Sequence, residues 1–287
     1  MPIAFAFISF FTWGIGVFFE AVVARRIGSY SLALWAYIFS ALVMTFYAPF
    51  AVEDLKGLTL ELLIFIFFIS IVGLFVGTIA YYEALKKSNR VLVGTIASSF
   101  PAVTVVISFV FLKETLSQQQ IIAILIIFLG FILSTLNIKE LRNKSILSDK
   151  GVLLAIITMI AWGAWAAFIK IPVNKIGWFW PNYFTFLLFP LIYFYMRLKR
   201  IKLEMPTVNN AFLPLIISTA FVRVAEFSYN FAISRGFVSV VASIAGANPI
   251  LFIILAFIFF KDKITKQQIA GIIITLFGIV LLSILSA

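Results

Sequence analysis

Two charged residues stand in the middle of a long apolar segment of this sequence. Arg223 lies near the centre of the segment 211–235, and Glu226 follows it three positions later. Residues three apart share one face of a helix, and Asn230 extends that face by a further turn. An ionised side chain at the centre of a membrane helix costs at least about 2.5–3.5 kcal/mol, so these groups should face a bundle interior or a wet cavity. The pattern predicts that Arg223 binds a substrate carboxylate or phosphate beside Glu226. An internal ion pair that only stabilises the helix is the alternative.

Polar residues also precede two prolines in the middle of other apolar segments. Ser98 and Ser99 stand before Pro101, and Asn248 stands before Pro249. Proline removes a backbone donor and clashes with the carbonyl four residues earlier, so each should kink its helix. Carbonyl groups freed at a kink are tolerated where they line a cavity, and there they can bind ligands. We expect substrate contacts at these serines and at Asn248, with a packing kink that touches no ligand as the alternative.

Four aromatic residues are further candidates for substrate contact. Trp13 and Trp162 are each followed by glycine at mid-depth of an apolar segment. Most tryptophans of membrane proteins lie at the interfaces, so a central indole either lines a cavity or fills the space between helices. Tyr81 and Tyr229, which the internal repeat described below makes equivalent, are also predicted substrate contacts.

Three carboxylates are candidates for proton coupling, namely Glu20, Glu83 and Glu226. Glu20 and Glu83 lie about one turn inside the ends of their apolar segments, as does Lys170. A carboxyl group in an apolar setting retains a proton more readily than it does in water. Long side chains at this depth can also extend to the membrane surface, which is the interpretation that we favour for Lys170.

The composition restricts the class of protein. The chain has 287 residues, of which 63% are apolar and 11% charged, whereas soluble domains have about 25% charged residues. It contains neither His nor Cys, which excludes zinc fingers, thiol nucleophiles, His-based acid–base pairs and disulfides. No nucleotide-binding loop and no nucleophile–base motif is present, so we expect no enzyme, no cofactor and no metal site. The net charge of +11 arises in short connections between apolar segments, which argues against a nucleic-acid partner.

Apolar segments of membrane-spanning length recur along the whole chain. A transmembrane helix needs about 20 mostly apolar residues. The segments that meet this requirement are 2–24, 31–50, 60–84, 91–112, 117–137, 151–171, 178–196, 211–235, 237–260 and 266–285. The sequence therefore predicts an all-α integral membrane protein with ten transmembrane helices.

The second half of the chain repeats the first. At shifts of 148 or 149 residues the equivalent positions are Trp13 and Trp162, Tyr81 and Tyr229, Ala84 and Ala232, Pro101 and Pro249, Glu114 and Asp262, Gln120 and Gln268, and Gly130 and Gly278. We expect a first five-helix repeat at 1–137, a connecting loop at 138–150 and a second repeat at 151–287. Because five is odd, the second repeat must enter the membrane from the opposite side, which is the inverted arrangement of alternating-access transporters.

On these residues the sequence resembles the drug/metabolite transporter superfamily, specifically its ten-helix proteins with two EamA domains. The resemblance covers nearly the whole chain and rests on Trp13-Gly14, Trp162-Gly163, Tyr82-Glu83-Ala84-Leu85, Pro101, Leu112-Lys113-Glu114-Thr115-Leu116, Gly130, Asn230-Phe231-Ala232-Ile233, Pro249, Lys261-Asp262-Lys263-Ile264 and Gly278. Lys170 falls where the family often has a basic residue, whereas Ala21 occupies the equivalent position of the first half. The resemblance implies a central cavity between helices 1, 3, 4, 6, 8 and 9. It also implies metabolite transport, frequently amino-acid export.

The sequence thus favours a secondary active transporter. We expect it to move a small polar metabolite, an amino acid or related carboxylate, outward by alternating access around a midplane cavity. Sugar or nucleoside uptake on the same fold is the alternative, in which Arg223 would serve structure. An ion channel, the alternative from another class, would need a ring of carbonyls or like charges. The expected partners are the substrate, the lipid bilayer and a coupling ion, either H⁺ or Na⁺. A monomer and a homodimer both stay open, and a prokaryotic inner membrane is the expected location.

The distribution of basic residues between the two faces predicts an orientation. Most Lys and Arg lie in the connections that follow the odd-numbered helices. Those on the other face are Lys56, Lys113, Lys170, Lys175 and Arg235. The positive-inside rule therefore places both termini outside, whereas the family resemblance implies cytoplasmic termini.

Overall fold

The computed structural model describes residues 1–135, 149–261 and 264–286, and every regular element in these ranges is a helix. Nine helices there are long and apolar enough to cross a membrane. Backbone N–H and C=O groups have no water to bind inside a bilayer, and a helix pairs them within one segment. The long apolar runs of the sequence therefore form helices, and the chain is a multi-pass integral membrane protein. Most of the connecting loop predicted at 138–150 lies outside the described residues.

The first half contains seven α-helices, two of which continue through other helical turns. They are α1 (Pro2–Ile27), α2 (Ser29–Tyr47) with the 3₁₀ helix η1 (Ala48–Gly57), α3 (Leu60–Ser70) with the π-helix η2 (Ile71–Val76), α4 (Gly77–Lys87), α5 (Arg90–Ser98), α6 (Phe100–Val110) and α7 (Gln118–Thr135). The predicted third span thus runs through α3, η2 and α4, and the predicted fourth span is divided between α5 and α6.

The second half follows the same plan. Its helices are α8 (Lys150–Phe168), α9 (Lys170–Ile176), α10 (Trp180–Phe186), α11 (Phe189–Leu198), η5 (Val208–Asn210), α12 (Phe212–Ile233), α13 (Val238–Ala245), α14 (Pro249–Phe260) and α15 (Lys266–Leu285). The predicted seventh span, 178–196, is divided between α10 and α11 at Leu187 and Leu188. Pro190 near the start of α11 has no N–H to continue the α10 ladder.

Equivalent turns of the two halves have the same backbone conformation. Gly28 and Gly177, which are 149 residues apart, have φ values of 68° and 72°. Lys113 and Lys261, which are 148 residues apart, have φ values of 54° and 57°. Positive φ is uncommon outside glycine, so a shared position for it in both halves shows that the internal repeat of the sequence is a repeat of structure.

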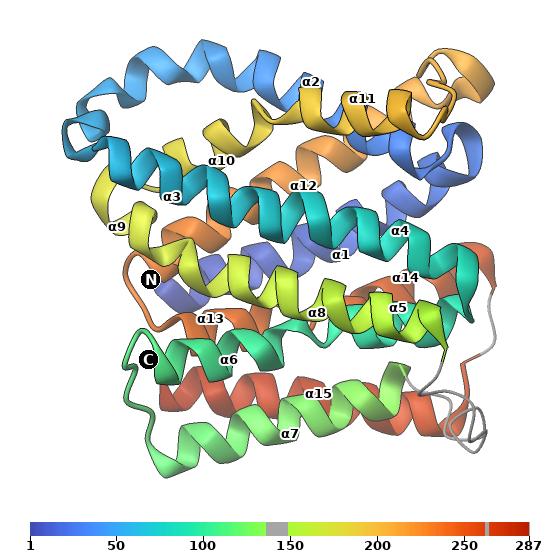
Figure 1. Ribbon diagram of the computed structural model, residues 1–287. Coiled ribbons are helices and arrows are strands. Elements are labelled where there is room, and N and C mark those ends of the chain that lie inside the picture. The colour runs from blue at the N-terminus through green and yellow to red at the C-terminus, as the bar shows by residue number, and fades with distance from the viewer. Residues whose placement is uncertain (136–148, 262–263, 287) are drawn as a thin grey trace.

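The repeats pack in the exchanged manner that an inverted pair requires. Helix α1 of the first half packs chiefly against α12 of the second, and the equivalent pair is α8 against α4. Helices α7 and α15 pack on each other at one side of the bundle (Figure 1). Helix α1 begins and α15 ends at the same end of the bundle (Figure 1), which we call the terminal end.

The glycines of the two Trp-Gly motifs permit close helix contact. A Cβ atom on Gly14 would lie 2.7 Å from the Leu251 side chain, and one on Gly163 would lie 2.6 Å from Val103. Leu251 and Val103 are themselves 148 residues apart. Each glycine thus brings the opening helix of its repeat against the divided helix of the other repeat.

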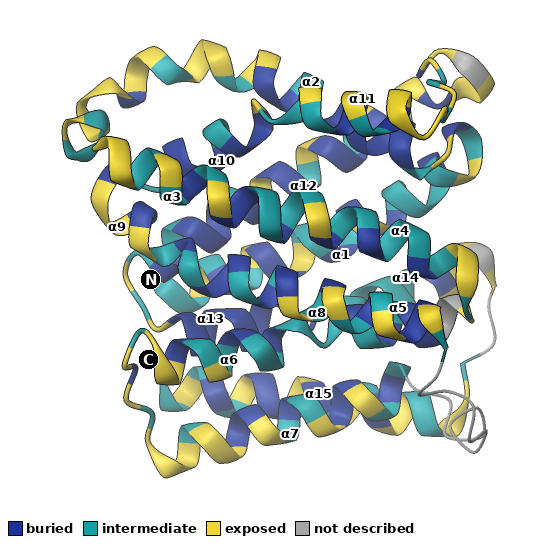
Figure 2. Cartoon of the chain, in the orientation of Figure 1, coloured by how far each residue is buried: buried dark blue, intermediate teal, exposed yellow. Residues whose placement is uncertain are grey.

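Burial follows the arrangement expected in lipid. Large apolar side chains such as Phe46 and Phe68 are exposed on the outside of the bundle, where acyl chains would cover them. The interior is concentrated in three spans of the second half: α8–α9 and α12 are 50% buried and α13–α14 is 56% buried, whereas the spans of the first half are 28–39% buried. Figure 2 shows these buried helices surrounded by more exposed ones. The buried polar residues of α12 and α13 therefore lie in the centre of the bundle.

Candidate functional site

The two charged residues of α12 form a buried ion pair. Arg223 donates from its NH1 nitrogen to Oε2 of Glu226 over 2.7 Å, and the two side chains are 8% and 9% exposed. The spacing of three residues on one helix permits this contact. Both charges are therefore held inside the bundle, as their depth in the span predicts.

The guanidinium of Arg223 lies over two aromatic rings. Its central carbon is 4.6 Å from the Phe186 ring centroid and 5.7 Å from that of Tyr37. Among the described residues, the buried Nε of Arg223 has no hydrogen-bond partner. Aromatic faces stabilise a cation without using its N–H donors, so Arg223 keeps donor capacity for a ligand.

A second carboxylate faces this pair from another helix. Glu20 of α1 lies within electrostatic range of both Arg223 and Glu226, and no hydrogen bond or ion pair engages it in the described part of the chain. The three residues Glu20, Arg223 and Glu226, which we call the charged cluster, hold one guanidinium and two carboxylates. Such a cluster can bind an anionic group at Arg223 and a cationic group at a carboxylate.

Tyrosines of two further helices line the cluster. Tyr81 and Tyr82 of α4 lie within electrostatic range of Glu20, as does Tyr37 of α2. The Tyr81 ring packs on Trp162 with 5.2 Å between centroids. Tyr81 and Trp162, which are predicted substrate contacts, therefore lie together on the Glu20 side of the cluster.

The equivalent aromatic pair is packed more tightly into the bundle. Trp13 lies 5.6 Å from Tyr229 between ring centroids. Tyr229 is 1% exposed and donates its hydroxyl proton to the carbonyl of Ala166 over 2.9 Å. The pseudo-symmetry of the fold therefore produces two Trp–Tyr pairs, but the hydroxyl of Tyr229 is already used within the protein.

Other predicted contacts have partners away from the cluster. The amide nitrogen of Asn230 donates to the carbonyl of Trp178 over 3.0 Å, and that of Asn248 donates to the carbonyl of Ala245 over 3.0 Å. The carboxylate of Glu83 accepts from Tyr30 at 2.8 Å and from Lys86 at 2.9 Å near the end of α4. The Oδ1 atom of Asn230 keeps no hydrogen-bond partner among the described residues, whereas the bonds of Glu83 leave it less capacity for proton binding than the charged cluster has.

Both divided helices break at their prolines. Ser99 separates α5 from α6 just before Pro101, and Asn248 caps α14 at Pro249. A Cβ atom on Gly246 would lie 2.1 Å from Pro101 Cγ, so the two breaks pack against each other. Ser98 is half-buried, and the Ser99 hydroxyl donates to the carbonyl of Thr95 at 2.9 Å.

Tyr37 and Phe186 were not predicted as site residues, because an aromatic residue in an apolar segment carries no distinguishing signal. The two residues are 149 positions apart and are therefore equivalent in the two repeats. Once either one was known to contact Arg223, the repeat would have pointed to the other. Glu114 was named only as part of the repeat and of the family resemblance, and its buried contacts were not predicted.

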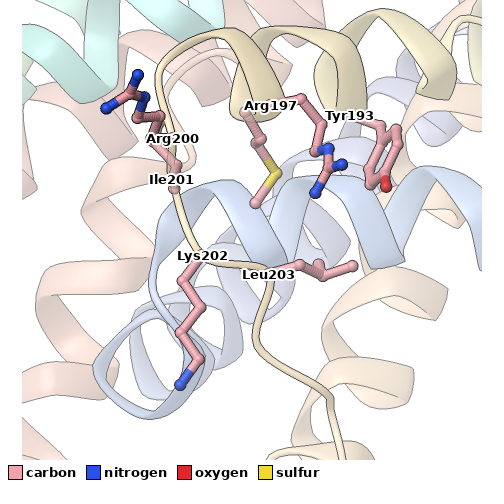
Figure 3. Close-up of a pocket in the computed structure, with 7 residues that line it drawn as sticks. Tyr193, Arg197, Arg200, Ile201, Lys202 and Leu203 are labelled. Carbon is pink, nitrogen blue, oxygen red and sulfur yellow. The ribbon is translucent and has the colours of Figure 1, made fainter.

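A cavity of about 540 Å³ lies apart from the charged cluster, at the end of α11 (Figure 3). It is lined by Tyr193, Met196, Arg197, Arg200, Ile201, Lys202 and Leu203. The basic residues Arg197, Arg200 and Lys202 lie at the end of α11 and in the connection after it, and basic residues in such connections favour anionic lipid headgroups. The cavity shares no residue with the charged cluster and is not the candidate substrate site.

A bundle of two inverted five-helix repeats around buried charges defines a membrane transport protein. The model of the EamA-like transporter family matches residues 1–136 and 149–284. The chain therefore belongs to the EamA-like transporter family, within the drug/metabolite transporter superfamily, and this is a family of transporters and not of enzymes.

Two relatives and one solved structure are similar to the chain. The chain is 30% identical over 128 residues to the uncharacterized protein MJ1333.1 of Methanocaldococcus jannaschii, over 44% of this chain and 89% of that protein. It is 22% identical over 146 residues to the uncharacterized transporter YojE of Bacillus subtilis, over 47% of each chain, so the match spans about half of YojE. A crystal structure with 15% sequence identity superposes with a TM-score of 0.79 over 99% of this chain and 98% of its own, which shows the shared fold.

Proposed function

We propose that this EamA-like transporter moves an amino acid or a related carboxylate, in the direction of export, by alternating access around the charged cluster. The observation that carries the proposal is the buried Arg223, which keeps an unbonded donor beside two carboxylates. A buried charge that serves only structure should have its hydrogen bonds satisfied within the protein. The direction of export rests on the family resemblance.

The charges of the cluster match those of a zwitterion. A guanidinium binds a carboxylate through charge-assisted hydrogen bonds, so the substrate carboxylate would bind Arg223. The substrate ammonium would then bind Glu20, which lies in range of Arg223 on the opposing helix. Aromatic rings at Phe186 and Tyr37 exclude water from this contact, which strengthens it.

Alternating access is supported by the exchanged packing of the repeats. Helices α1 and α12, which carry the whole charged cluster, belong to different repeats. A rocking motion of one repeat against the other would therefore change the separation between Glu20 and the Arg223–Glu226 pair. Binding of substrate at the cluster would then be coupled to which face of the protein is open.

Uptake of a sugar or nucleoside is a second candidate, favoured by the Trp–Tyr pairs. Trp162 with Tyr81 and Trp13 with Tyr229 present aromatic faces at equivalent depths, and flat or apolar ligand faces stack on such rings. In this case Arg223 would only neutralise the carboxylates.

Counterflow into proteoliposomes tests the proposal. Vesicles preloaded with unlabelled amino acids, carboxylates, sugars or nucleosides would receive the same compound in labelled form. We expect saturable exchange of at least one amino acid by the unchanged protein and its abolition in Arg223→Met. Full exchange by Arg223→Met, or exchange of sugars or nucleosides alone, would contradict the proposal.

Arg235→Met is the matched control. Arg235 also lies over an aromatic ring, with its central carbon 3.8 Å from the Phe231 centroid, but it is exposed and stands outside the charged cluster. The control variant should retain exchange. Thermal unfolding in detergent would establish that both variants are folded.

A further inference from the structure

Glu114 makes a buried contact across the two repeats at the terminal end. Its Oε1 atom accepts from the backbone N–H of Val238 at 2.6 Å. Its Oε2 atom accepts from the N–H and the hydroxyl of Ser239 at 3.0 Å and 2.6 Å. Glu114 follows α6 in the first repeat, whereas Val238 and Ser239 begin α13 in the second. A carboxylate at a helix N-terminus satisfies unpaired N–H groups and is stabilised by the helix dipole.

Lys170 completes this contact from a third segment. Its ammonium donates to the carbonyl of Gly236 over 2.8 Å and lies 3.4 Å from Oε1 of Glu114. The Lys170 side chain is 19% exposed and that of Glu114 is 4% exposed. Lys170 therefore binds across the bundle in this conformation, where the sequence favoured extension to the membrane surface.

The backbone before Glu114 is held in an uncommon conformation. Lys113 has a φ of 54°, and the N–H of Glu114 donates to the carbonyl of Ser108 over 3.2 Å. This turn directs the carboxylate inward to α13 instead of outward to solvent. Every residue of α13 is buried, so the contact fixes one end of a helix that leads to the break at Asn248.

The ion pair cannot be repeated residue for residue in the other half. The position equivalent to Lys170 in the first repeat is Ala21, which carries no charge. Asp262, the equivalent of Glu114, lies outside the described residues. A contact that forms at only one end of a transporter stabilises the conformation in which that end is closed.

We infer that Glu114 and Lys170 form a latch that holds the terminal end closed between α13 and the end of α6. The inference rests on the proposed alternating access, because a transporter that opens at the terminal end must separate Glu114 of the first repeat from α13 of the second. Glu114 and Lys170 act here as positioning residues and touch no substrate.

Labelling of an introduced cysteine tests the latch, and the absence of native cysteine makes the readout specific. Ser243→Cys would place a thiol on α13 at a position that is 1% exposed. Glu61→Cys, at the exposed start of α3, would mark the terminal end. A membrane-impermeant maleimide would be added to right-side-out and inverted vesicles that contain each variant.

In the Ser243→Cys background, Glu114→Gln should increase the labelling rate about tenfold or more, from the face that labels Glu61→Cys. The estimate corresponds to the weakening of one buried charged contact, at 1.4 kcal/mol per factor of ten. Lys170→Gln should give a smaller increase, and Lys170→Arg should restore slow labelling. An unchanged labelling rate in a folded Glu114→Gln protein would overturn the inference.

Glu53→Gln is the matched control at the same end. Glu53 pairs with Lys56, and their side chains are 81% and 77% exposed, so its removal should leave labelling of Ser243→Cys unchanged. If Glu53→Gln increased the labelling rate as much as Glu114→Gln does, the change would be due to surface charge, and the inference of a latch would be overturned. The readout needs no substrate, so the latch can stand if the amino-acid panel fails in counterflow, and it can fail while counterflow succeeds.

Discussion

The two repeats have the same turns and helix breaks but carry different charges at equivalent positions. The position equivalent to Arg223 in the first repeat is Phe75, and the one equivalent to Glu226 is Thr78. Glu20 of the first repeat corresponds to Ile169 of the second. The charged cluster therefore exists once, although the helices that hold it exist twice.

Residues that both repeats share are those that the fold requires, whereas residues found in only one repeat are candidates for substrate binding. Both repeats keep the positive-φ turns, the glycines at helix contacts and the Trp–Tyr pairs. In the proposed mechanism, the duplicated scaffold would supply two conformations related by exchange of the repeats. The single asymmetric cluster at their interface would be the binding site that both conformations share.

Glu20→Gln should have the largest effect on coupling. We expect accumulation driven by a pH gradient to be lost, while counterflow persists with a raised KM because the neutral amide binds the substrate ammonium more weakly. Glu20 is the carboxylate of the cluster without an ion-pair partner in the described residues. The groups that face it are Arg223, Glu226 and the tyrosines of α2 and α4. Uptake of labelled substrate with and without an imposed pH gradient measures the effect.

Glu83→Gln is the control for this prediction. Its carboxylate binds Tyr30 and Lys86 near the end of α4, so coupling should be unchanged. Loss of coupling in Glu83→Gln with normal coupling in Glu20→Gln would show that the proton site lies at the helix end.

The two glycines of the Trp-Gly motifs should respond equally to substitution. Gly14→Leu and Gly163→Leu should each lower the free energy of unfolding by about 1–3 kcal/mol, the usual range for overpacking, since a Cβ atom at either meets the opposing helix. Gly94→Ala should be neutral or stabilising, because no atom lies within 4 Å of its Cβ position. Thermal unfolding in detergent measures these changes, and strongly unequal effects would argue against equivalent packing.

The tryptophans should respond unequally despite their symmetry. Trp162→Leu should raise KM about two- to tenfold, since loss of an aromatic contact weakens binding by about 0.5–1.5 kcal/mol and its partner Tyr81 faces Glu20. Trp13→Leu should change KM less, because Tyr229 is bonded to Ala166 inside the bundle. Equal changes in KM would mean that both pairs line the site.

We expect the smallest change, a small decrease in Tm, from substitution of Asp149, which lies where the two repeats are joined. Asp149 accepts from the Ser88 hydroxyl and from the N–H of Gly151, both at 2.7 Å, and these hydrogen bonds lower the pKa of Asp149. A lowered pKa stabilises the folded state above the pKa of the unfolded chain, and the contribution is lost as the pH falls through the folded-state value. Asp149→Asn should slightly lower Tm at neutral pH, and its difference from the unchanged protein should vanish in acid. If the difference in Tm between the two proteins were the same at every pH, it would arise from the capping geometry of Asp149 and not from its charge.

Much of the fold could be predicted from the sequence because lipid restricts the choices. Long apolar runs must be helical, and residues such as Pro101 and Pro249 kept their register across the repeat. The divisions of the predicted spans into shorter helices were not fully predicted, since Leu187 and Leu188 look like any apolar residues and Pro190 alone marks that break.

The site was less accessible to sequence reasoning. Depth in a span identified Arg223 and Glu226, because a charge there needs an explanation. The environment of Arg223 was not predictable, since Phe186 and Tyr37 come from helices distant in sequence. The buried role of Glu114 depends on a left-handed turn at Lys113 that side-chain type does not encode.

Binding of an amino acid and its blocked analogues tests the central claim, that Arg223 binds a substrate carboxylate, most directly. The amino acid that exchanges best in counterflow would be compared with its amide, which lacks the carboxylate, and with its N-acetyl derivative, which lacks the ammonium. A buried charged pair contributes about 2–5 kcal/mol, so the unchanged protein should bind the amide at least about 30-fold more weakly than the acid. This difference should disappear in Arg223→Met. Equal binding of the acid and the amide by the unchanged protein would contradict the claim.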